Sequence, residues 1–310
     1  MRILKPTRAN IALAAQALEE GKLGIVPTET VYGLAAVATN PAAVKAIFKA
    51  KGRPADNPLI HHVADLDGAK ELVSEMPEIA VALAHRFWPG PLSLVLPKSD
   101  KVLLAATGGL QTVAIRVPAH PVALSLLQRL GQPLAMPSAN PFMSLSPTKV
   151  PHIDAKLSKK VDFILDGGPA RVGIESTVIG VEGDKLILLR PGGLSIEEIE
   201  AAAGQAVTIP KKAKRILAPG QYRRHYAPKT RVRLVPSLKP SQAGLVLGPA
   251  EGPNQREMPT DPVKYAQRLF DVLFELDELG LRVIYVQRPP AEPAWRAVMD
   301  RLRKAASEAD

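Results

Sequence analysis

Helix and strand signals alternate along the chain as far as residue 203, and this order constrains the fold more than any other feature. An apolar helical stripe at 11–18 is followed by an apolar strand pattern at 23–27. Asn40 and Pro41 form a typical helix start, and the helix is predicted to end near Gly52. Further strand patterns lie at 58–63, 92–96, 112–117 and 161–166, and further helix patterns at 78–87 and 120–130. This alternation predicts an α/β fold.

A hairpin pattern predicts that the sheet is mixed. The segment 178–190 turns at 182–184, and strands joined by so short a turn run antiparallel. Ser195 and Glu198 then show the spacing of a capping box, which predicts a helix to about Ala203. We therefore expect an open, twisted mixed sheet.

The composition changes after residue 210. Residues 211–233 hold nine Lys or Arg and no acid, and prolines and a glycine interrupt any helix there. This composition predicts a basic, proline-containing linker. Strand patterns and two helix patterns, at 261–278 and 293–306, then predict a smaller Rossmann-like α/β domain. The expected division is a first domain at 1–208, a linker or active-site lid at 209–230 and a small C-terminal domain at 231–310.

The overall composition limits the classes of function. The 310-residue chain has no cysteine, so disulfides and thiolate metal sites are excluded. No apolar run has the length of a signal peptide or a membrane span, which predicts a cytoplasmic protein without a membrane partner. The formal net charge of +10 favours anionic partners such as nucleotides, phosphates or RNA.

Two cations stand on a stiff turn in the segment AKGRPADNPL, residues 50–59. Lys51 offers a point charge and Arg53 a planar fork, which together suit phosphate or carboxylate. Cations are also favoured at a helix end without any ligand. The segment alone leaves both interpretations open.

Other polar side chains accompany apolar strand patterns. Thr28 follows one pattern, Arg116 lies within another and Ser176 stands where a third begins. A buried arginine needs an anionic partner, either an internal acid or a ligand carboxylate. The loop at 134–150 carries hydroxyls and amides between prolines. It suits a polar ligand, but taken alone it is more typical of a plain Pro/Ser loop that caps the next helix.

Several familiar site motifs are missing from the sequence. It has neither GxxxxGK[ST] nor GxGxxG nor a GxSxG elbow. The six histidines show no HExxH spacing, so we expect no zinc site and no metal held by protein ligands alone. His61 and His62 lie on one strand pattern, and alternation would turn one of them inward.

The polar segments, taken in order, resemble the YrdC-like family of threonylcarbamoyl-AMP synthases. The resemblance rests on Lys51-Gly-Arg53 paired with Ser138-Ala-Asn140, together with PTETVYGL, FWPGPLSLVL, TVAIRVPAHP, SPT, GIESTV and LLRPGG. It covers residues 7–205. The basic linker and the small domain after it are similar to the long, two-domain (Sua-type) branch of that family.

The resemblance implies a nucleotidyltransferase, an L-threonylcarbamoyladenylate synthase. Such an enzyme condenses L-threonine, bicarbonate and ATP into threonylcarbamoyl-AMP and releases pyrophosphate. Mg²⁺ would arrive with ATP. The product would pass to a separate transferase that completes threonylcarbamoyladenosine on tRNA. Substrates of this kind require a cleft that concentrates cations and excludes water, with little covalent work for the protein.

The resemblance also assigns roles to residues of this sequence. The catalytic set is Lys51, Arg53, Ser138 and Asn140. L-Threonine would be held by Thr28, His62, Arg116 and Ser176, with its carboxylate on Arg116. ATP would contact Lys51, Arg53, Asn57, Thr107, Ser138, Asn140, Ser146, Arg190 and Tyr226. Tyr222, His225 and Tyr226 of the linker are expected to close over the site.

Two positions depart from the family pattern. Phe142-Met143-Ser144-Leu145 replaces a loop that usually contains a Ser-Gly pair, and His61 replaces an apolar strand residue. The missing glycine could alter the backbone near the phosphates.

Two alternatives remain open at this point. A double-stranded RNA or ribosome-associated binding module would use the excess positive charge directly and would explain weak RNA binding. It predicts cations spread over a surface and no pocket for an amino acid. A carbamoyl transferase of hydrogenase maturation would share the domain type, but that branch carries zinc-finger cysteines, and this chain has none.

Overall fold

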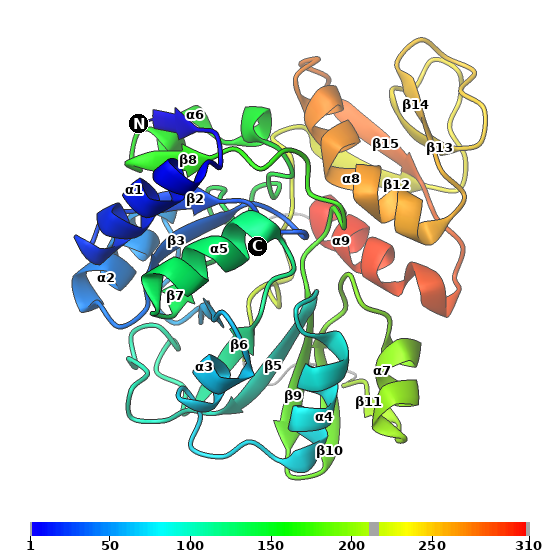
Figure 1. Ribbon diagram of the computed structural model, residues 1–310. Helices are drawn as coiled ribbons and strands as arrows, with labels where there is room; N and C mark the ends of the chain where they lie inside the picture. The colour runs from blue at the N-terminus through cyan, green and yellow to red at the C-terminus, as the bar shows by residue number, and fades with distance from the viewer. Residues whose placement is uncertain (1, 211–216, 308–310) are drawn as a thin grey trace.

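The computed structural model describes residues 2–210 and 217–307, which build two separate sheets (Figure 1). The large sheet has eleven strands in the order β1-β8-β2-β3-β7-β4-β6-β5-β9-β10-β11, and it contains both parallel and antiparallel pairs. The small sheet has four parallel strands in the order β12-β15-β13-β14. The predicted mixed α/β fold with a second, smaller α/β unit is therefore confirmed.

The large sheet draws its strands from the first two thirds of the chain. They are β1 (Arg2–Leu4), β2 (Gly24–Val26), β3 (Gly33–Val37), β4 (Ile60–His62), β5 (Leu92–Pro97), β6 (Thr112–Arg116), β7 (Leu134–Ala135), β8 (Phe163–Leu165), β9 (Thr177–Glu182), β10 (Lys185–Arg190) and β11 (Val207–Thr208). The predicted hairpin is the antiparallel pair β9–β10, in which Glu182 lies opposite Lys185. Strands β1, β3 and β11 were not predicted.

Helices pack on the large sheet. They are α1 (Arg8–Glu19), α2 (Pro41–Lys51), α3 (Leu66–Lys70), α4 (Glu78–Phe87), α5 (Pro121–Leu130), η1 (Val150–His152), α6 (Ala155–Ser158) and α7 (Ile196–Ala203). The predicted caps explain several of these bounds. Asn40 accepts hydrogen bonds from the N–H groups of Ala42 and Ala43, and Gly52 ends α2 with a φ of 63°. Ser195 and Glu198 form the predicted capping box of α7.

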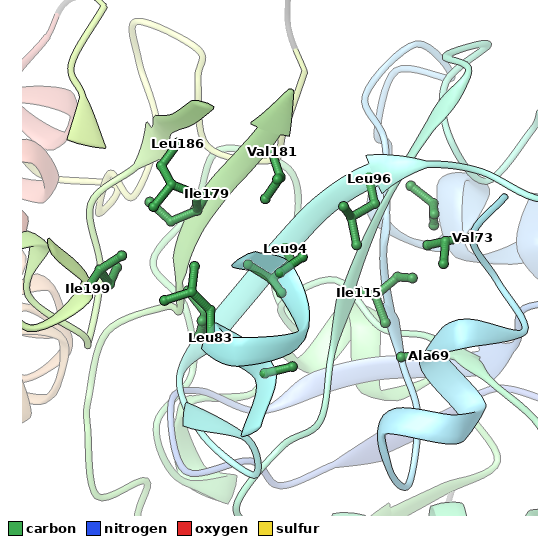
Figure 2. Packing of buried hydrophobic residues seen from close by; sticks show 14 of the residues in the cluster. Ala69, Val73, Leu83, Leu94, Leu96, Ile115, Ile179, Val181, Leu186 and Ile199 are labelled. Carbon is green, nitrogen blue, oxygen red and sulfur yellow. The ribbon is translucent and has the colours of Figure 1, made fainter. Parts of the chain in front are cut away.

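An apolar cluster fixes the strands that lead into the polar region described below. Leu94 of β5, Ile115 of β6 and Ile179 of β9 pack with Leu83 of α4 and Ile199 of α7 (Figure 2). All five side chains are buried. The ends of β6 and β9 are therefore held in place by packing on the opposite face of the sheet.

Both histidines of β4 are buried, although the alternation rule suggested that only one would face inward. The strand lies between β7 and β6 in the middle of the sheet, and all three of its residues are buried. Burial lowers the pKa of His61 to about 4, and neither ring nitrogen of His61 has a partner among the described residues. His61 is therefore a neutral core residue.

The second unit contains β12 (Arg231–Val235), β13 (Gly244–Leu247), β14 (Gln255–Met258), α8 (Pro262–Asp277), β15 (Val283–Gln287), η2 (Pro293–Trp295) and α9 (Arg296–Ala306). Its core includes Phe270 and Leu302, and the same cluster continues onto Leu145 and Ile174 of the first unit. The two units thus share apolar packing.

The predicted linker falls between the last strand of the large sheet and the first strand of the small sheet. Strand β11 ends at Thr208 and β12 begins at Arg231. Residues 217–230 contain no helix or strand, while 211–216, the most basic part of the predicted linker, lie outside the described residues. None of the described helices is both long and apolar enough to cross a membrane. The exact division into 1–208, 209–230 and 231–310 stays a prediction.

Candidate active site

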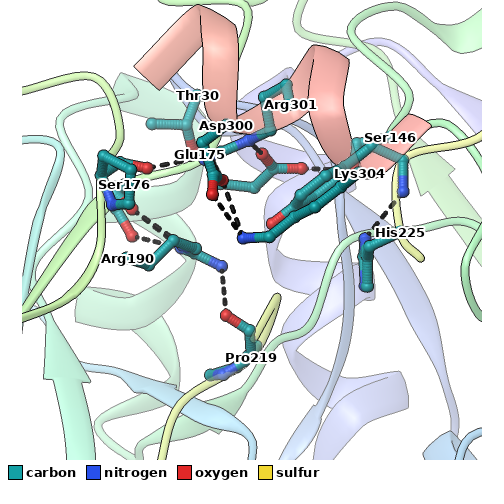
Figure 3. A network of polar contacts seen from close by, with 12 residues as sticks. Thr30, Ser146, Glu175, Ser176, Arg190, Pro219, His225, Asp300, Arg301 and Lys304 are labelled. Atoms are coloured by element: carbon teal, nitrogen blue, oxygen red, sulfur yellow. Dashed lines mark hydrogen bonds and ion pairs between the residues drawn. The ribbon is translucent and has the colours of Figure 1, made fainter. Parts of the chain in front are cut away.

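A cleft gathers polar side chains from segments that are far apart in the sequence, and part of its network is seen in Figure 3. The lining comes from the β2–β3 turn, from the turn after α2, from β4, β6 and β10, from the loop after β7, from the two residues before β9 and from residues 219–220 and 225–226 of the linker. The sequence-predicted residues that line it are Thr28, Arg53, His62, Arg116, Ser138, Ser176, Arg190 and Tyr226.

Arg116 is paired with an internal acid. Its Nη2 lies 2.6 Å from Oε1 of Glu29, and its Nη1 donates to the Thr30 hydroxyl at 2.9 Å. Nε donates to the carbonyl of Gly90. The sequence left the choice between an internal acid and a ligand open, and the internal acid is Glu29. A ligand carboxylate would therefore share Arg116 with Glu29.

The β2–β3 turn and β4 supply two more predicted residues. The Thr28 hydroxyl donates to the carbonyl of Val31 at 2.6 Å and lies 2.8 Å from the Thr30 hydroxyl, so the turn is braced from within. His62 is buried beside it, and burial together with the charge of Arg116 holds the pKa of His62 well below its ordinary value. A neutral imidazole therefore faces the cleft.

Ser176 and Arg190 connect β9, β10 and the linker. Arg190 donates from Nη2 to the Ser176 carbonyl at 2.9 Å and to the Ser176 hydroxyl at 3.0 Å (Figure 3). Its Nη1 donates to the carbonyl of Pro219 at 3.2 Å. The Ser176 hydroxyl also lies 2.8 Å from that of Ser93. Arg190 thus holds a linker carbonyl beside the cleft.

Lys51 brings the two halves of the predicted motif together. It ends α2, and its Nζ donates to the carbonyl of Ser138 at 2.5 Å and to that of Asn140. An ammonium group has three donors, so one stays available as far as the described residues go. Burial, followed by the neighbouring charge of Arg53, lowers the pKa of Lys51 well below its ordinary value. An anion placed next to Lys51 would raise this pKa again.

Arg53 is held by its own turn. Nε donates to the carbonyl of Asn57 at 3.2 Å, and Nη2 donates to the Asn57 amide oxygen and to the carbonyl of Pro58 at 2.7 Å. In the described part of the chain these bonds leave the two N–H groups of Nη1 for a ligand. Burial lowers the pKa of Arg53 to about 9.

The remaining predicted residues support the cleft rather than line it. Asn57 holds Arg53, and the Thr107 hydroxyl donates to the carbonyl of Leu110 within its own loop. The Asn140 amide donates to the carbonyl of Ser144 at 2.8 Å, and the Ser146 hydroxyl donates to Glu175. All four are buried polar residues behind the lining.

The linker lies over the cleft. Tyr226 is buried with a φ of 57°, and its hydroxyl has no partner among the described residues. His225 is also buried, and burial and then the charges of Arg53 and Lys51 hold its pKa well below the ordinary value. Tyr222 is more exposed, and its hydroxyl lies 3.5 Å from the carboxylate of Asp56.

The loop that departs from the family pattern contacts this linker. Met143 has a φ of 69°, a conformation that favours glycine, and its carbonyl accepts from the Ala227 N–H at 2.9 Å. The Phe142 ring packs edge-on against Tyr222, with ring centroids 5.2 Å apart. The altered loop thus keeps a backbone suited to glycine and adds an aromatic contact to the linker.

Two pairs of residues in and around the cleft were not predicted as site residues. Glu29 and Thr30 surround Arg116, and Glu175 accepts from Arg301 of α9 at 2.7 Å (Figure 3). The acid of GIESTV was a visible signal, because a carboxylate in an apolar context needs a partner. Arg301 had no such signal, since it lies in a helix rich in charged residues.

Within 2–210 and 217–307, no group of three or more His, Cys, Asp or Glu side chains could hold a metal ion.

Family comparisons cover nearly the whole chain. The profile of the family described as "Telomere recombination" matches residues 16–192, and that described as "Threonylcarbamoyl-AMP synthase, C-terminal domain" matches residues 194–307. Together they span both sheets.

Individual proteins are similar over the same extent. The threonylcarbamoyl-AMP synthase of Pyrococcus abyssi is 43% identical, over 95% of this chain and 93% of its own length. That of Bacillus subtilis is 39% identical, over 96% and 92%. The crystal structure of P. abyssi Sua5 complexed with L-threonine superimposes with a TM-score of 0.89 at 40% identity, covering 98% of this chain and 97% of that one.

Proposed function

The chain belongs to the family of two-domain threonylcarbamoyl-AMP synthases, and we propose that its cleft joins L-threonine, bicarbonate and ATP into threonylcarbamoyl-AMP. The observation that carries the proposal is the contact of Lys51 with the carbonyls of Ser138 and Asn140. It places both halves of the predicted motif beside a cleft that Arg53 and Arg116 line.

The triphosphate is assigned to a phosphate subsite made of Lys51, Arg53, Ser138 and Arg190. In the described part of the chain none of its three cations has a carboxylate within 4.0 Å, the ion-pair distance that Arg116 and Arg301 satisfy. They are held by carbonyl and amide oxygens instead. Uncompensated cations in a buried cleft favour a polyanion.

Residues behind the lining complete the nucleotide half of the site. We assign Asn57, Thr107, Asn140 and Ser146 to hold the loops on which the phosphate ligands stand, with Tyr226 covering the nucleotide. The Asn140 amide oxygen and the Asn57 amide nitrogen are buried without a described partner. Such groups could take a ligand or its bound water. Magnesium is assigned to the substrate as MgATP.

L-Threonine is assigned to a threonine subsite made of Thr28, His62, Arg116 and Ser176. The relative crystallised with L-threonine supports an amino-acid ligand in this fold. Arg116 would receive the carboxylate while it keeps Glu29 as a second partner. The neutral ring of His62 can accept a hydrogen bond from the amino or hydroxyl group.

The chemistry needs position and charge more than a nucleophile. The threonine amine, in its uncharged form, attacks the bicarbonate carbon, and the bicarbonate hydroxyl leaves with an amine proton as water to give a carbamate. A carbamate oxygen then attacks the α-phosphorus, and pyrophosphate leaves with its electron pair. This is nucleotidyl transfer. The phosphate subsite would stabilise the charge on the leaving pyrophosphate, and the buried linker residues would keep water from the carbamate.

We also propose how the product is used. A carbamoyl adenylate is a reactive mixed anhydride, so a partner transferase would use it promptly on tRNA in the cytoplasm. The RNA-binding alternative receives less support. It requires cations on an open surface, whereas Lys51, Arg53, Arg116 and Arg190 are buried around one cleft.

Pyrophosphate release tests the proposal. ATP, Mg²⁺ and bicarbonate are incubated with each amino acid in turn, and the adenylate is identified by mass spectrometry. We expect release and a threonylcarbamoyl-AMP mass with L-threonine above all others. Release that is independent of amino acid or of bicarbonate would contradict the assignment.

A further inference from the structure

One buried ion pair connects the second domain to the cleft. Arg301 of α9 is 1% exposed, and its Nε donates to Oε2 of Glu175 at 2.7 Å (Figure 3). Glu175 lines the cleft, while Arg301 is 126 positions away in the sequence. A residue of the small domain therefore reaches the site of the large one.

Each oxygen of the Glu175 carboxylate accepts a hydrogen bond. One carboxylate oxygen accepts from the Ser146 hydroxyl and the other from Arg301. Burial alone would raise the pKa of Glu175, but the charges of Arg301 and Arg190 and the hydrogen bonds lower it below its ordinary value. The carboxylate is therefore an anion close to the cations of the phosphate subsite.

Arg301 also contacts the linker. Its guanidinium carbon lies 4.6 Å from the centroid of the Tyr226 ring, a cation–π distance. Its Nη1 donates to the carbonyl of Pro191 at 2.9 Å and to Asp300 at 2.7 Å. One guanidinium thus touches an acid and an aromatic ring that both line the cleft.

We propose that Arg301 is a positioning residue for the nucleotide half of the reaction, supplied by the second domain. It neutralises Glu175 and holds Tyr226, so that Lys51, Arg53 and Arg190 keep their charge for the triphosphate. The inference rests on the proposed function, because it presumes ATP in that half of the cleft.

The other possible partners of Glu175 show why the positive charge of Arg301 is needed. Ser146 is neutral and cannot cancel a carboxylate. Without Arg301, the anion would pair with a cation of the phosphate subsite and would repel incoming phosphate. The threonine subsite has its own acid, Glu29, and among the described residues Arg301 contacts Glu175, Pro191, Tyr226 and Asp300 rather than that subsite. The effect should therefore fall on ATP and spare L-threonine.

The test compares two arginines of α9 in the full chain. Arg301→Met removes the buried charge at similar length, and Arg303→Met makes the same change at an exposed position. Calorimetry measures Kd for ATP and for L-threonine, and steady-state kinetics measure KM and kcat. Thermal unfolding reports stability. We expect Arg301→Met to weaken the binding of ATP by about 10- to 100-fold and to leave the binding of L-threonine unchanged. Arg303→Met should bind both ligands as the parent does.

A second arm tests the charge mechanism. Glu175→Gln removes the anion and keeps its shape, so the double variant Glu175→Gln/Arg301→Met should recover most of the lost ATP affinity. A role in stability alone predicts instead that Arg301→Met weakens both ligands and that the double variant recovers both, because the double variant also removes the uncompensated buried charge.

Each outcome decides the inference. Parental ATP affinity in Arg301→Met, an equal loss for both ligands, or a double variant as weak as Arg301→Met would overturn it. If Arg301→Met does not fold, Glu175→Gln and Arg301→Lys take its place in the test. Weaker ATP binding in the folded Glu175→Gln variant would overturn the inference. Parental ATP binding in Arg301→Lys, with the ion pair lost, would overturn it as well. Absence of threonine-dependent pyrophosphate release in the parent would instead refute the proposed function. The ATP affinities of the parent and the variants could still be compared in that case.

Discussion

The threonine subsite and the phosphate subsite hold their cations in different ways. In the threonine subsite, Arg116 lies 2.6 Å from the carboxylate of Glu29. In the phosphate subsite, Lys51 and Arg53 are bound by carbonyl and amide oxygens. The first arrangement is close to neutral, and the second carries excess positive charge.

This difference matches the two substrates. L-Threonine is a zwitterion with no net charge, so a neutral pair can bind both its ends without attracting polyanions. ATP carries several negative charges, and cations without an acid favour it strongly. The position of internal acids, rather than the number of cations, therefore sorts the ligands within the cleft.

Removing an unpaired cation should have the largest effect on turnover. Lys51→Ala and Arg53→Ala are each expected to reduce pyrophosphate release by about 100- to 1,000-fold, because each donor faces charge that develops on the phosphates. The matched control is Lys49→Ala, an exposed lysine on the same helix. Normal turnover in either cleft variant would refute the phosphate subsite.

Breaking the paired arginine should come next. Arg116→Ala is expected to weaken L-threonine binding by ~2–5 kcal/mol, because it removes a carboxylate ligand and leaves Glu29 buried without its partner. Calorimetry measures the affinity, and thermal unfolding should show a loss of stability. Arg129→Ala, at an exposed position of α5, is the control. Unchanged affinity for threonine would show that the pair is only structural.

The pH dependence should distinguish the subsites with a smaller effect. The pKa of Lys51 is lowered in the free cleft, chiefly by burial and then by Arg53, and bound phosphate would raise it again. ATP affinity should therefore be full below the lowered pKa of Lys51 and fall as pH rises through it. Binding should take up a proton in that range.

Calorimetry in two buffers of different ionisation enthalpy measures this uptake. Lys51→Arg keeps its charge over the same range and should show none. L-Threonine binding should lack this Lys51-dependent uptake. Equal proton uptake in the parent and in Lys51→Arg would point to another group.

The smallest effect is expected from backbone geometry alone. Met143 has a φ of 69° beside the phosphate subsite, and a non-glycine residue pays roughly 1 kcal/mol for this conformation. Met143→Gly should therefore stabilise the fold by up to about 1 kcal/mol, partly offset by the entropy of glycine in the unfolded chain. Urea unfolding measures the change. A clear loss of stability would mean that the Met143 side chain packs more favourably than its backbone is strained.

Much of the fold followed from local sequence. The helix at 78–87 and the start of α2 at Pro41 agree with the prediction, because periodicity and capping act within a few residues. Strand β3 was not predicted because its residues, Gly33–Val37, continue a polar segment that resembled a binding loop.

The sequence by itself determined most of the longer helices and strands, the order of the polar segments and the identity of the cations. Only the tertiary structure decided which cations have acids. The sequence allowed either a ligand carboxylate or an internal acid as the partner of Arg116, and the fold pairs it with Glu29. Arg301 looks like one charge among many in a surface helix, yet the docking of α9 buries it on Glu175. Ion pairing depends on distances of a few ångströms between segments that are far apart in the chain, and no local pattern encodes those distances.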